Sequence, residues 1–167
     1  MTTALSNSSY NNNHSAGFTL IELMVTIAVL AIIVSIAAPN VSAQLANQRV
    51  KATAVTLENA LKEAKAESVI RRQNVTVAYD STANTITLTG NNSAVISTYS
   101  INNSSSVSQS ITPTSVTAVV FEPNKMINGA NTKVTYSICD SGSTKETKRQ
   151  VVINKIANIS LKNAGSC

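Results

Sequence analysis

The feature that most constrains this chain is an apolar run of 21 residues, Phe18 to Ala38, which contains a single carboxylate, Glu22. A helix of this length is about 30 Å long, because each residue adds about 1.5 Å, and it therefore matches the hydrocarbon core of a bilayer. An ionised group inside a bilayer costs a few kcal/mol unless it is paired or lies near the interface. The run predicts a membrane-spanning helix in which Glu22 either has a partner or is tolerated at the membrane edge.

Small residues precede the apolar run, in the order Ser15-Ala16-Gly17. In an ordinary secretory signal the small-residue cleavage site follows the apolar stretch instead. A cut after Gly17 would remove a polar leader, residues 1–17, and keep the apolar helix on the mature chain. The only histidine, His14, would then be lost. Without a histidine, a carboxylate cluster or a glycine-rich phosphate loop, we expect no enzyme, no catalytic residue, no metal and no cofactor.

The sequence Gly17-Phe18-Thr19-Leu20-Ile21-Glu22 resembles the processing motif of type IV pilins and type II secretion pseudopilins. The resemblance implies that a prepilin peptidase cuts between Gly17 and Phe18 and methylates the new N-terminus at Phe18. It also implies that Glu22 neutralises the N-terminal amine of a neighbouring subunit and sets the subunit register. Pro39 resembles the proline that bends the helix near the end of the membrane segment.

The segment after the apolar run predicts a continuation of the same helix, because residues 41–70 contain neither Gly nor Pro. We therefore expect an amphipathic continuation over residues 39–72, ending at Arg71-Arg72, where the helix dipole favours cations. Small and medium-sized residues recur at steps of three and four, which is typical of one packing face. That face consists of Val50, Ala54, Leu57, Leu61, Ala64 and Ser68.

After Gln73 the pattern changes to period two, which is typical of β-strands. The alternating segments and the turn residues between them predict seven short strands, over residues 75–79, 85–89, 95–99, 115–121, 133–139, 150–154 and 158–161. The Ser- and Asn-rich tract 102–110 is expected to be a mobile loop. The sequence thus predicts an α+β fold, in which one long helix packs on a small antiparallel β-sandwich of about seven strands over residues 73–167.

This second part resembles the minor pilin and pseudopilin subgroup named for GspH, FimT and FimU. The resemblance is carried by Arg71-Arg72, by the turn Phe121-Glu122-Pro123-Asn124, by the strand that enters Ile138-Cys139-Asp140, and by the terminal hairpin. It implies a long helix with a sandwich of two antiparallel sheets.

The only two cysteines, Cys139 and Cys167, have neither the spacing of a zinc site nor that of a CxxC redox pair. An even pair in an exported chain predicts a disulfide, which the periplasm supports. Such a bond would tie the C-terminal tail to the sheet and contribute about 3–4 kcal/mol in the entropic model. Two free thiols are the alternative.

The C-terminal region is basic, in a chain of net charge +5, and this raises the possibility of DNA binding. The candidate contacts are Lys145, Lys148, Arg149, Lys155 and Lys162. FimT-type proteins carry a tail motif of the form Gly-Arg-x-Arg, whereas the corresponding hairpin here has the sequence Ala157-Asn158-Ile159-Ser160. No aromatic residue is interleaved for base stacking. A solvated lysine face is therefore the preferred interpretation, and it favours a FimU-like structural subunit over a DNA receptor.

We therefore expect a minor pilin of a type IV pilus, in the small complex that initiates the fibre or forms its tip. The chain would cross the inner membrane once, with its C-terminal domain in the periplasm, before joining an extracellular pilus. Its partners would be other minor pilins, the major pilin, prepilin peptidase and the assembly platform. A DNA-binding subunit for transformation and a minor pseudopilin of type II secretion are the alternatives. Small residues permit close helix approach at Ala28, Ala31, Ser35 and Ala37.

Overall fold

The computed structural model describes residues 18–116, 118–129 and 131–167, and for residues 37–40 it describes the backbone alone. The predicted leader, including Gly17, lies outside the described residues. The chain divides into two compact units, Met1–Ala38 and Pro39–Cys167. Its helices are α1, Leu20–Arg71, and a short 3-10 turn, η1, Asn91–Ser93. Its strands are β1 Val75–Asp80, β2 Thr85–Thr89, β3 Val95–Ser100, β4 Ser105–Thr112, β5 Val119–Phe121, β6 Lys133–Asp140, β7 Thr147–Ile153 and β8 Ile159–Ser166.

The first unit contributes the N-terminal part of α1. Among the described residues, no single helix is both long enough and apolar enough to cross a membrane by itself. The stretches Leu20–Ile36 and Val41–Arg71, taken together across residues 37–40, could do so by length and composition. The side chain of Pro39 lies outside the described side chains, so the predicted kink at this residue stays a prediction.

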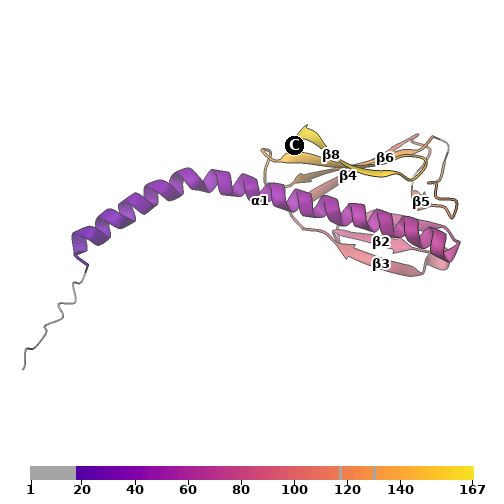
Figure 1. The fold of residues 1–167 in the computed structure, drawn as a ribbon, viewed down its shortest axis with the longest axis horizontal. Helices are drawn as coiled ribbons and strands as arrows, with labels where there is room; N and C mark the ends of the chain where they lie inside the picture. Colours follow the sequence, from indigo (N-terminus) through magenta and orange to yellow (C-terminus); the bar gives the residue numbers. More distant parts are fainter. Residues whose placement is uncertain (1–17, 117, 130) are drawn as a thin grey trace, which may run out of the picture. The chain divides into compact units, whose positions relative to one another are not determined.

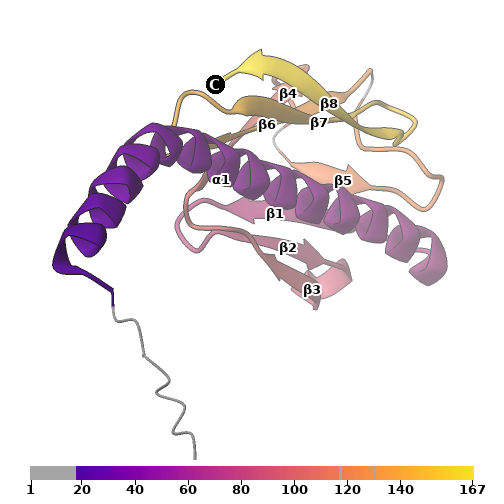
Figure 2. The same ribbon diagram turned by 60° about the vertical axis from the view of Figure 1, so that its left-hand side comes forward.

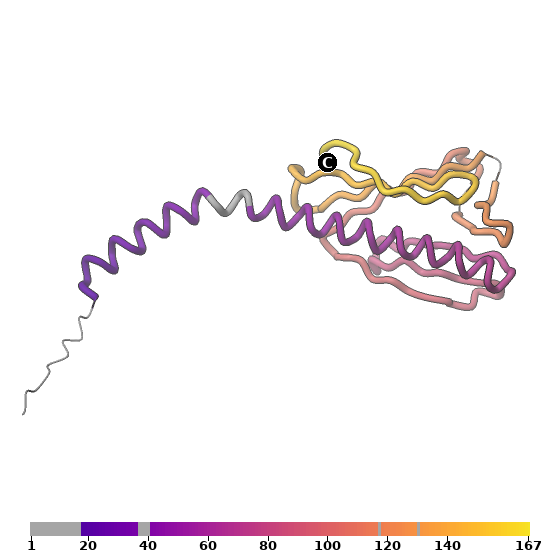
Figure 3. The backbone as a smooth tube through the Cα atoms, viewed as in Figure 1, coloured from indigo at the N-terminus to yellow at the C-terminus, as the bar shows by residue number. Residues whose placement is uncertain are grey.

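In the second unit, the strands form two four-stranded antiparallel sheets. The first has the order β3-β2-β1-β5 and the second the order β4-β6-β7-β8. The part of α1 after residue 38 runs alongside both sheets (Figure 1; Figure 2). After α1 the chain forms β1 to β3 of the first sheet and crosses to the second sheet for β4. It returns to the first sheet for β5 and ends in the second with β6 to β8 (Figure 3). This arrangement confirms the predicted fold, a long helix with an antiparallel sandwich.

The core lies where the apolar face of α1 meets the inner faces of the two sheets. The six residues predicted for this helix face, Val50, Ala54, Leu57, Leu61, Ala64 and Ser68, are all buried. The sheets contribute large side chains such as Leu88, Phe121 and Tyr136. Several of the helix positions are alanines, which let the sheets approach the helix backbone closely and give a dense core.

The expectation of a mobile loop over residues 102–110 is wrong, because Ser105–Thr112 forms β4. All eight of its residues are paired with β6, from Ser105 opposite Asp140 to Thr112 opposite Lys133. Backbone hydrogen bonds to a long neighbouring strand do not depend on side-chain type, so a serine-rich segment can complete a sheet. The sandwich therefore has eight strands in its described part rather than about seven.

Three of the predicted strands differ from the structure by more than one residue at an end. The segment predicted over 115–121 is a strand only at β5, Val119–Phe121. Conversely, β7 begins three residues earlier than predicted and β8 continues to Ser166. The added end residues are mostly polar, and they belong to strands that pair through the backbone where the apolar alternation has already ended.

Candidate functional site

The N-terminus of α1 is the part of the chain that carries the processing motif. Thr19 precedes the helix, and its Oγ1 accepts a hydrogen bond from the backbone N–H of Glu22 at 3.2 Å. The carbonyl of Thr19 accepts a hydrogen bond from the N–H of Leu23, also at 3.2 Å. Thr19 is therefore the N-cap, and the order Thr-x-x-Glu matches a capping box. Phe18 lies outside the helix, so the predicted new N-terminus precedes the cap.

Glu22 thus occupies the first helical turn, where the positive end of the helix dipole favours a carboxylate. This position stabilises the start of the helix whether or not a neighbouring subunit is present. Any pairing between Glu22 and an N-terminal amine would act in addition to this local effect. The structure contains one chain, so the predicted pairing stays a prediction.

The side chains of residues 18–36 are all exposed, including every large apolar one. Phe18 is 83% exposed and Leu20 is 75% exposed. A continuous apolar surface of this size marks a site for lipid or for other helices. Ala28, Ala31 and Ser35 belong to this exposed surface, whereas the side chain of Ala37 lies outside the described ones.

Besides the capping Thr19, the two described hydroxyl side chains of this apolar segment find partners within the helix. Thr26 Oγ1 donates to the carbonyl of Leu23 at 2.8 Å, and Ser35 Oγ donates to the carbonyl of Ile32 at 2.8 Å. Such bonds remove the cost of placing a hydroxyl in a medium without water. The segment is therefore compatible with an apolar environment along its described length, apart from Glu22.

In the second unit, polar contacts join α1 to the second sheet. Asn47 Oδ1 accepts a hydrogen bond from the N–H of Thr147 at 2.9 Å. Thr53 Oγ1 and Ser105 Oγ lie 2.8 Å apart and are both buried. These bonds hold strands β7 and β4 against one stretch of the helix.

An ion pair adds to these contacts, with 3.5 Å between Arg49 Nη1 and Asp140 Oδ2. The Asp140 side chain is 1% exposed, and its Oδ2 atom accepts no hydrogen bond, so Arg49 is the cation that compensates this charge. The other oxygen, Oδ1, accepts a hydrogen bond from the N–H of Gly142 at 3.0 Å. Asp140 therefore joins the helix to the turn between β6 and β7.

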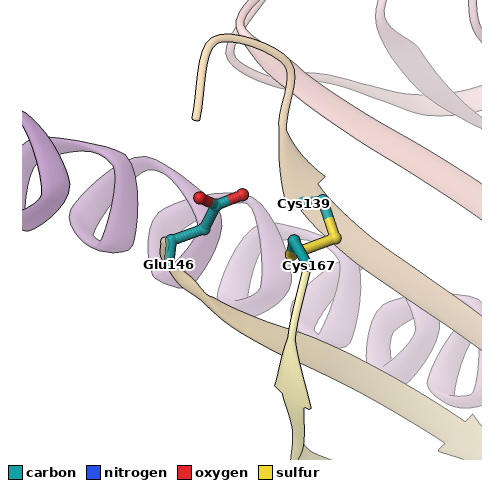
Figure 4. Close-up of side chains that lie close together, drawn as sticks. All are labelled: Cys139, Glu146 and Cys167. Atoms are coloured by element: carbon teal, nitrogen blue, oxygen red, sulfur yellow. A yellow bond between two sulfur atoms is a disulfide. The ribbon is translucent and has the colours of Figure 1, made fainter. Parts of the chain in front are cut away.

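The predicted disulfide is present in the structure, with Cys139 bonded to Cys167 and 5.8 Å between their Cα atoms. It joins β6 to the end of the chain, and the side chain of Glu146 lies beside it (Figure 4). Glu146 is buried, and its Oε1 accepts a hydrogen bond from the N–H of Asp140 at 2.9 Å.

Burial by itself raises the pKa of Glu146. Hydrogen bonds from Ser143 and from the backbone of the same turn outweigh this effect and lower the pKa below its ordinary value. Through these bonds Glu146 organises the turn next to the disulfide.

Glu63 connects α1 to the first sheet, as Asn47, Arg49 and Thr53 connect it to the second. It accepts hydrogen bonds from Ser97 Oγ and Tyr99 Oη, both on β3. These bonds lower the pKa of Glu63, and the bond to Glu63 raises the pKa of Tyr99. Glu63, Arg49 and Asp140 were not identified from the sequence, because their partners are far away in the chain.

The five candidate DNA contacts do not form one cluster. Lys145 lies in the turn before β7 and Lys155 in the turn after it, at opposite ends of the strand. Lys155 Nζ donates to the carbonyl of Ile127 at 2.7 Å, and Arg149 Nη1 donates to Asn163 Oδ1. Lys148 lies between Thr147 and Arg149, where the register between β7 and β8 shifts.

Lys162 lies on β8 and pairs with Gln150 of β7. At least two of the five cations therefore have structural bonds, and DNA binding through this set stays a prediction.

Comparison with known proteins gives two family matches. The prokaryotic N-terminal methylation motif matches residues 12–38, and the family described as type II transport protein GspH matches residues 53–156. The second match covers more than half of the chain. A comparison with the sequences of curated proteins finds no significant match.

Solved structures with the same fold include two crystal forms of the type IV minor pilin FimU of Pseudomonas aeruginosa, both 19% identical to this chain. One has a TM-score of 0.53 and covers 70% of this chain and 98% of that chain. The other has a TM-score of 0.54, with 72% and 96% covered. The minor pseudopilin EpsH of the Vibrio cholerae type 2 secretion system is 11% identical, with a TM-score of 0.56, 69% and 97% covered. At such identities the likeness establishes the fold alone, whereas the family match is decisive: the chain belongs to the GspH family.

Proposed function

We propose that this chain is a minor pilin of a type IV pilus, which waits in the inner membrane and then joins the complex that starts the fibre or forms its tip. The observation that carries the proposal is the presence of both matches on one chain, the N-terminal methylation motif over 12–38 and the GspH family over 53–156. A minor subunit of this kind has a structural role, and we expect no catalytic activity.

The mechanism follows from the exposed apolar part of α1. In the membrane, lipid covers the side chains of residues 18–36, with the second unit in the periplasm. In the fibre, helices of neighbouring subunits cover them instead. Because lipid is as apolar as the helix surface, the transfer depends on close packing and on polar pairs rather than on the hydrophobic effect. Ala28, Ala31 and Ser35 provide the small side chains that close packing requires.

Processing supplies the polar pair. Cleavage between Gly17 and Phe18 creates a positively charged amine on the methylated Phe18. Glu22 of one subunit would neutralise this amine on the next, since opposite charges attract strongly in a medium of low dielectric constant. A subunit in the wrong register would leave both charges unpaired in the apolar core. The pair would therefore select register.

A minor pseudopilin of a type II secretion system is the second candidate. The likeness to EpsH favours it, because that likeness has a TM-score comparable to those of the FimU structures. Both candidates share the membrane-stored helix and differ in the assembly that the chain joins. Partners in either case are other subunits, the prepilin peptidase and the inner-membrane assembly platform.

The test is made on protein from its native host. Mass spectrometry should find an N-terminus at Phe18 with one added methyl group, and sheared pili should contain the chain. Glu22→Gln should be processed normally but incorporated poorly. Glu58→Gln removes a half-buried carboxylate that pairs with Lys62 on the same helix, and this variant should be incorporated like the unaltered chain. A mature chain that keeps residues 1–17 would overturn the proposal. Incorporation of Glu22→Gln at the normal level would overturn the role of the ion pair.

A further inference from the structure

We infer that a groove between α1 and β7 binds the phosphate of an anionic membrane phospholipid. This inference rests on the proposed function, because it needs the chain to be anchored in a membrane. The groove, called here the α1–β7 groove, has a volume of about 490 Å³, within the range of small-ligand sites. It is lined by Gln44, Asn47, Gln48, Lys51, Thr147 and Arg149.

The lining of the α1–β7 groove suits an anion. It contains two cations, three amide side chains and a hydroxyl, and no carboxylate. The ion pairs of the described residues join Arg49 to Asp140, Lys62 to Glu58 and Arg71 to Glu67, so Lys51 and Arg149 are in none of them. Two cations that face the same groove without a carboxylate repel each other, and a phosphate between them would relieve this repulsion.

The walls of the groove are held in place by bonds that leave its cations available. Asn47 donates to the carbonyl of Ala43 at 3.0 Å and accepts from the N–H of Thr147. Arg149 uses Nη1 to hold Asn163, and the rest of its guanidinium group keeps further N–H donors. Lys51 is exposed, so its ammonium group can turn into the groove.

An apolar groove adjoins the polar one and identifies the kind of anion. It is lined by Val41, Gln44, Leu45 and Gln48, so the two glutamines belong to both grooves. Val41 is 60% exposed and Leu45 is 49% exposed. The apolar residues of this second groove, Val41 and Leu45, precede Lys51 along α1. The order along the helix, apolar first and cationic next, is the order of acyl chain and phosphate in a phospholipid.

The spacing along the helix agrees with this assignment. Val41 and Leu45 are exposed and follow the predicted span 18–38, and a tilted helix can bring Leu45 to the edge of the hydrocarbon core. Lys51 follows six residues later, about 9 Å along the helix. The headgroup region is about 5–8 Å thick on each side of a bilayer, and a lysine side chain adds several ångströms of reach. Nucleic acid is disfavoured here, because the groove has no aromatic side chain on which a base could stack.

The experiment uses the full mature chain in neutral detergent, with native mass spectrometry as the readout. Phosphatidylglycerol and phosphatidylcholine with the same acyl chains are added separately, and inorganic phosphate is a third arm. We expect the chain to retain phosphatidylglycerol about tenfold more than phosphatidylcholine. Retention should fall to the phosphatidylcholine level in the double variant Lys51→Gln/Arg149→Gln.

The matched control is Lys133→Gln/Lys162→Gln, which removes two exposed cations from strands of the same sheet. It should retain phosphatidylglycerol like the unaltered chain. The single variant Lys51→Gln changes an exposed side chain, so it reports on binding even if the loss of Arg149 disturbs β7.

Three outcomes would overturn the inference: equal loss in both double variants, equal retention of both lipids, or displacement of the lipid by equimolar inorganic phosphate. In each case normal cleavage before Phe18 and incorporation into pili would leave the minor pilin proposal intact.

Discussion

The ion pair between Arg49 and Asp140 permits a quantitative test of how α1 is held to the second sheet. Arg49→Leu removes the cation and leaves a buried carboxylate, of which 1% of the side chain is exposed. At the observed 3.5 Å, the attraction of two unit charges is about 5 kcal/mol at an effective dielectric constant of about 20. Because 35% of the Arg49 side chain is exposed, solvent reduces this value. We expect Arg49→Leu to lower the free energy of unfolding by about 2–3 kcal/mol.

The second variant of the cycle, Asp140→Asn, removes the charge but keeps an oxygen that can accept the bond from the N–H of Gly142. We expect it to cost about 1 kcal/mol. The double variant should be more stable than Arg49→Leu alone, because the buried group no longer needs a cation. A coupling energy of about 2 kcal/mol is therefore expected.

Pulse proteolysis of the full chain in neutral detergent over a urea series measures the unfolding of the second unit directly. Lys51→Leu, on the same helix and outside any described ion pair, is the matched control and should change the midpoint little. If Arg49→Leu and the double variant unfold at the same urea concentration, the carboxylate does not depend on the arginine. The proposed role of the pair in holding helix and sheet together would then be refuted.

Three further predictions concern the same unit. Replacing Cys139 and Cys167 by Ser should lower the free energy of unfolding by about 3–4 kcal/mol, because a cross-link over 28 residues restricts the unfolded chain; a urea midpoint that reduction of the unaltered chain leaves unchanged would contradict this. Glu63 has a lowered pKa in the folded state, so it should stabilise the fold above about pH 4.3 and lose this effect as the pH falls through its folded pKa. Tyr99→Phe should weaken this acid dependence in an acid-unfolding titration. An acid-unfolding profile identical to that of the unaltered chain would contradict the prediction. Leu61→Ala should cost about 3–5 kcal/mol, because Leu61 is fully buried in the core; a cost below about 1 kcal/mol in urea unfolding would show that the site collapses.

The packing face of α1 could be predicted from the sequence, because the period of a helix is a local property. Val50, Leu57 and Leu61 recur at the spacing that places them on one side, and all three are buried. The strand β4 could not be predicted in the same way. Its alternation is carried only by Val107 and Ile111 among serines, and it forms because β6 offers it a complete row of backbone partners.

The contacts between helix and sheets could not be predicted either. Arg49 and Asp140 are 91 positions apart in the sequence, and neither lies in a local pattern that names its partner. The disulfide could be predicted from the sequence, since Cys139 and Cys167 are the only cysteines and only one intramolecular pair can form. Two cysteines allow one intramolecular disulfide. Eight carboxylates and thirteen lysines and arginines allow many ion pairs, so the sequence does not single out the pair of Arg49 and Asp140.

Along α1 the two tasks that we propose for this chain, assembly and support of the sandwich, fall to stretches of different chemistry. Up to residue 36 the described side chains are exposed and almost uncharged, and the hydroxyls bond to the helix itself, so this stretch can exchange lipid for other helices without unfolding. After residue 45 the helix is buried on one side only and is bonded to strands of both sheets, through Thr53 on one and Glu63 on the other. A change in the first stretch should therefore affect assembly and leave the sandwich stable. A change in the second should destabilise the sandwich and affect assembly only through the loss of folded protein.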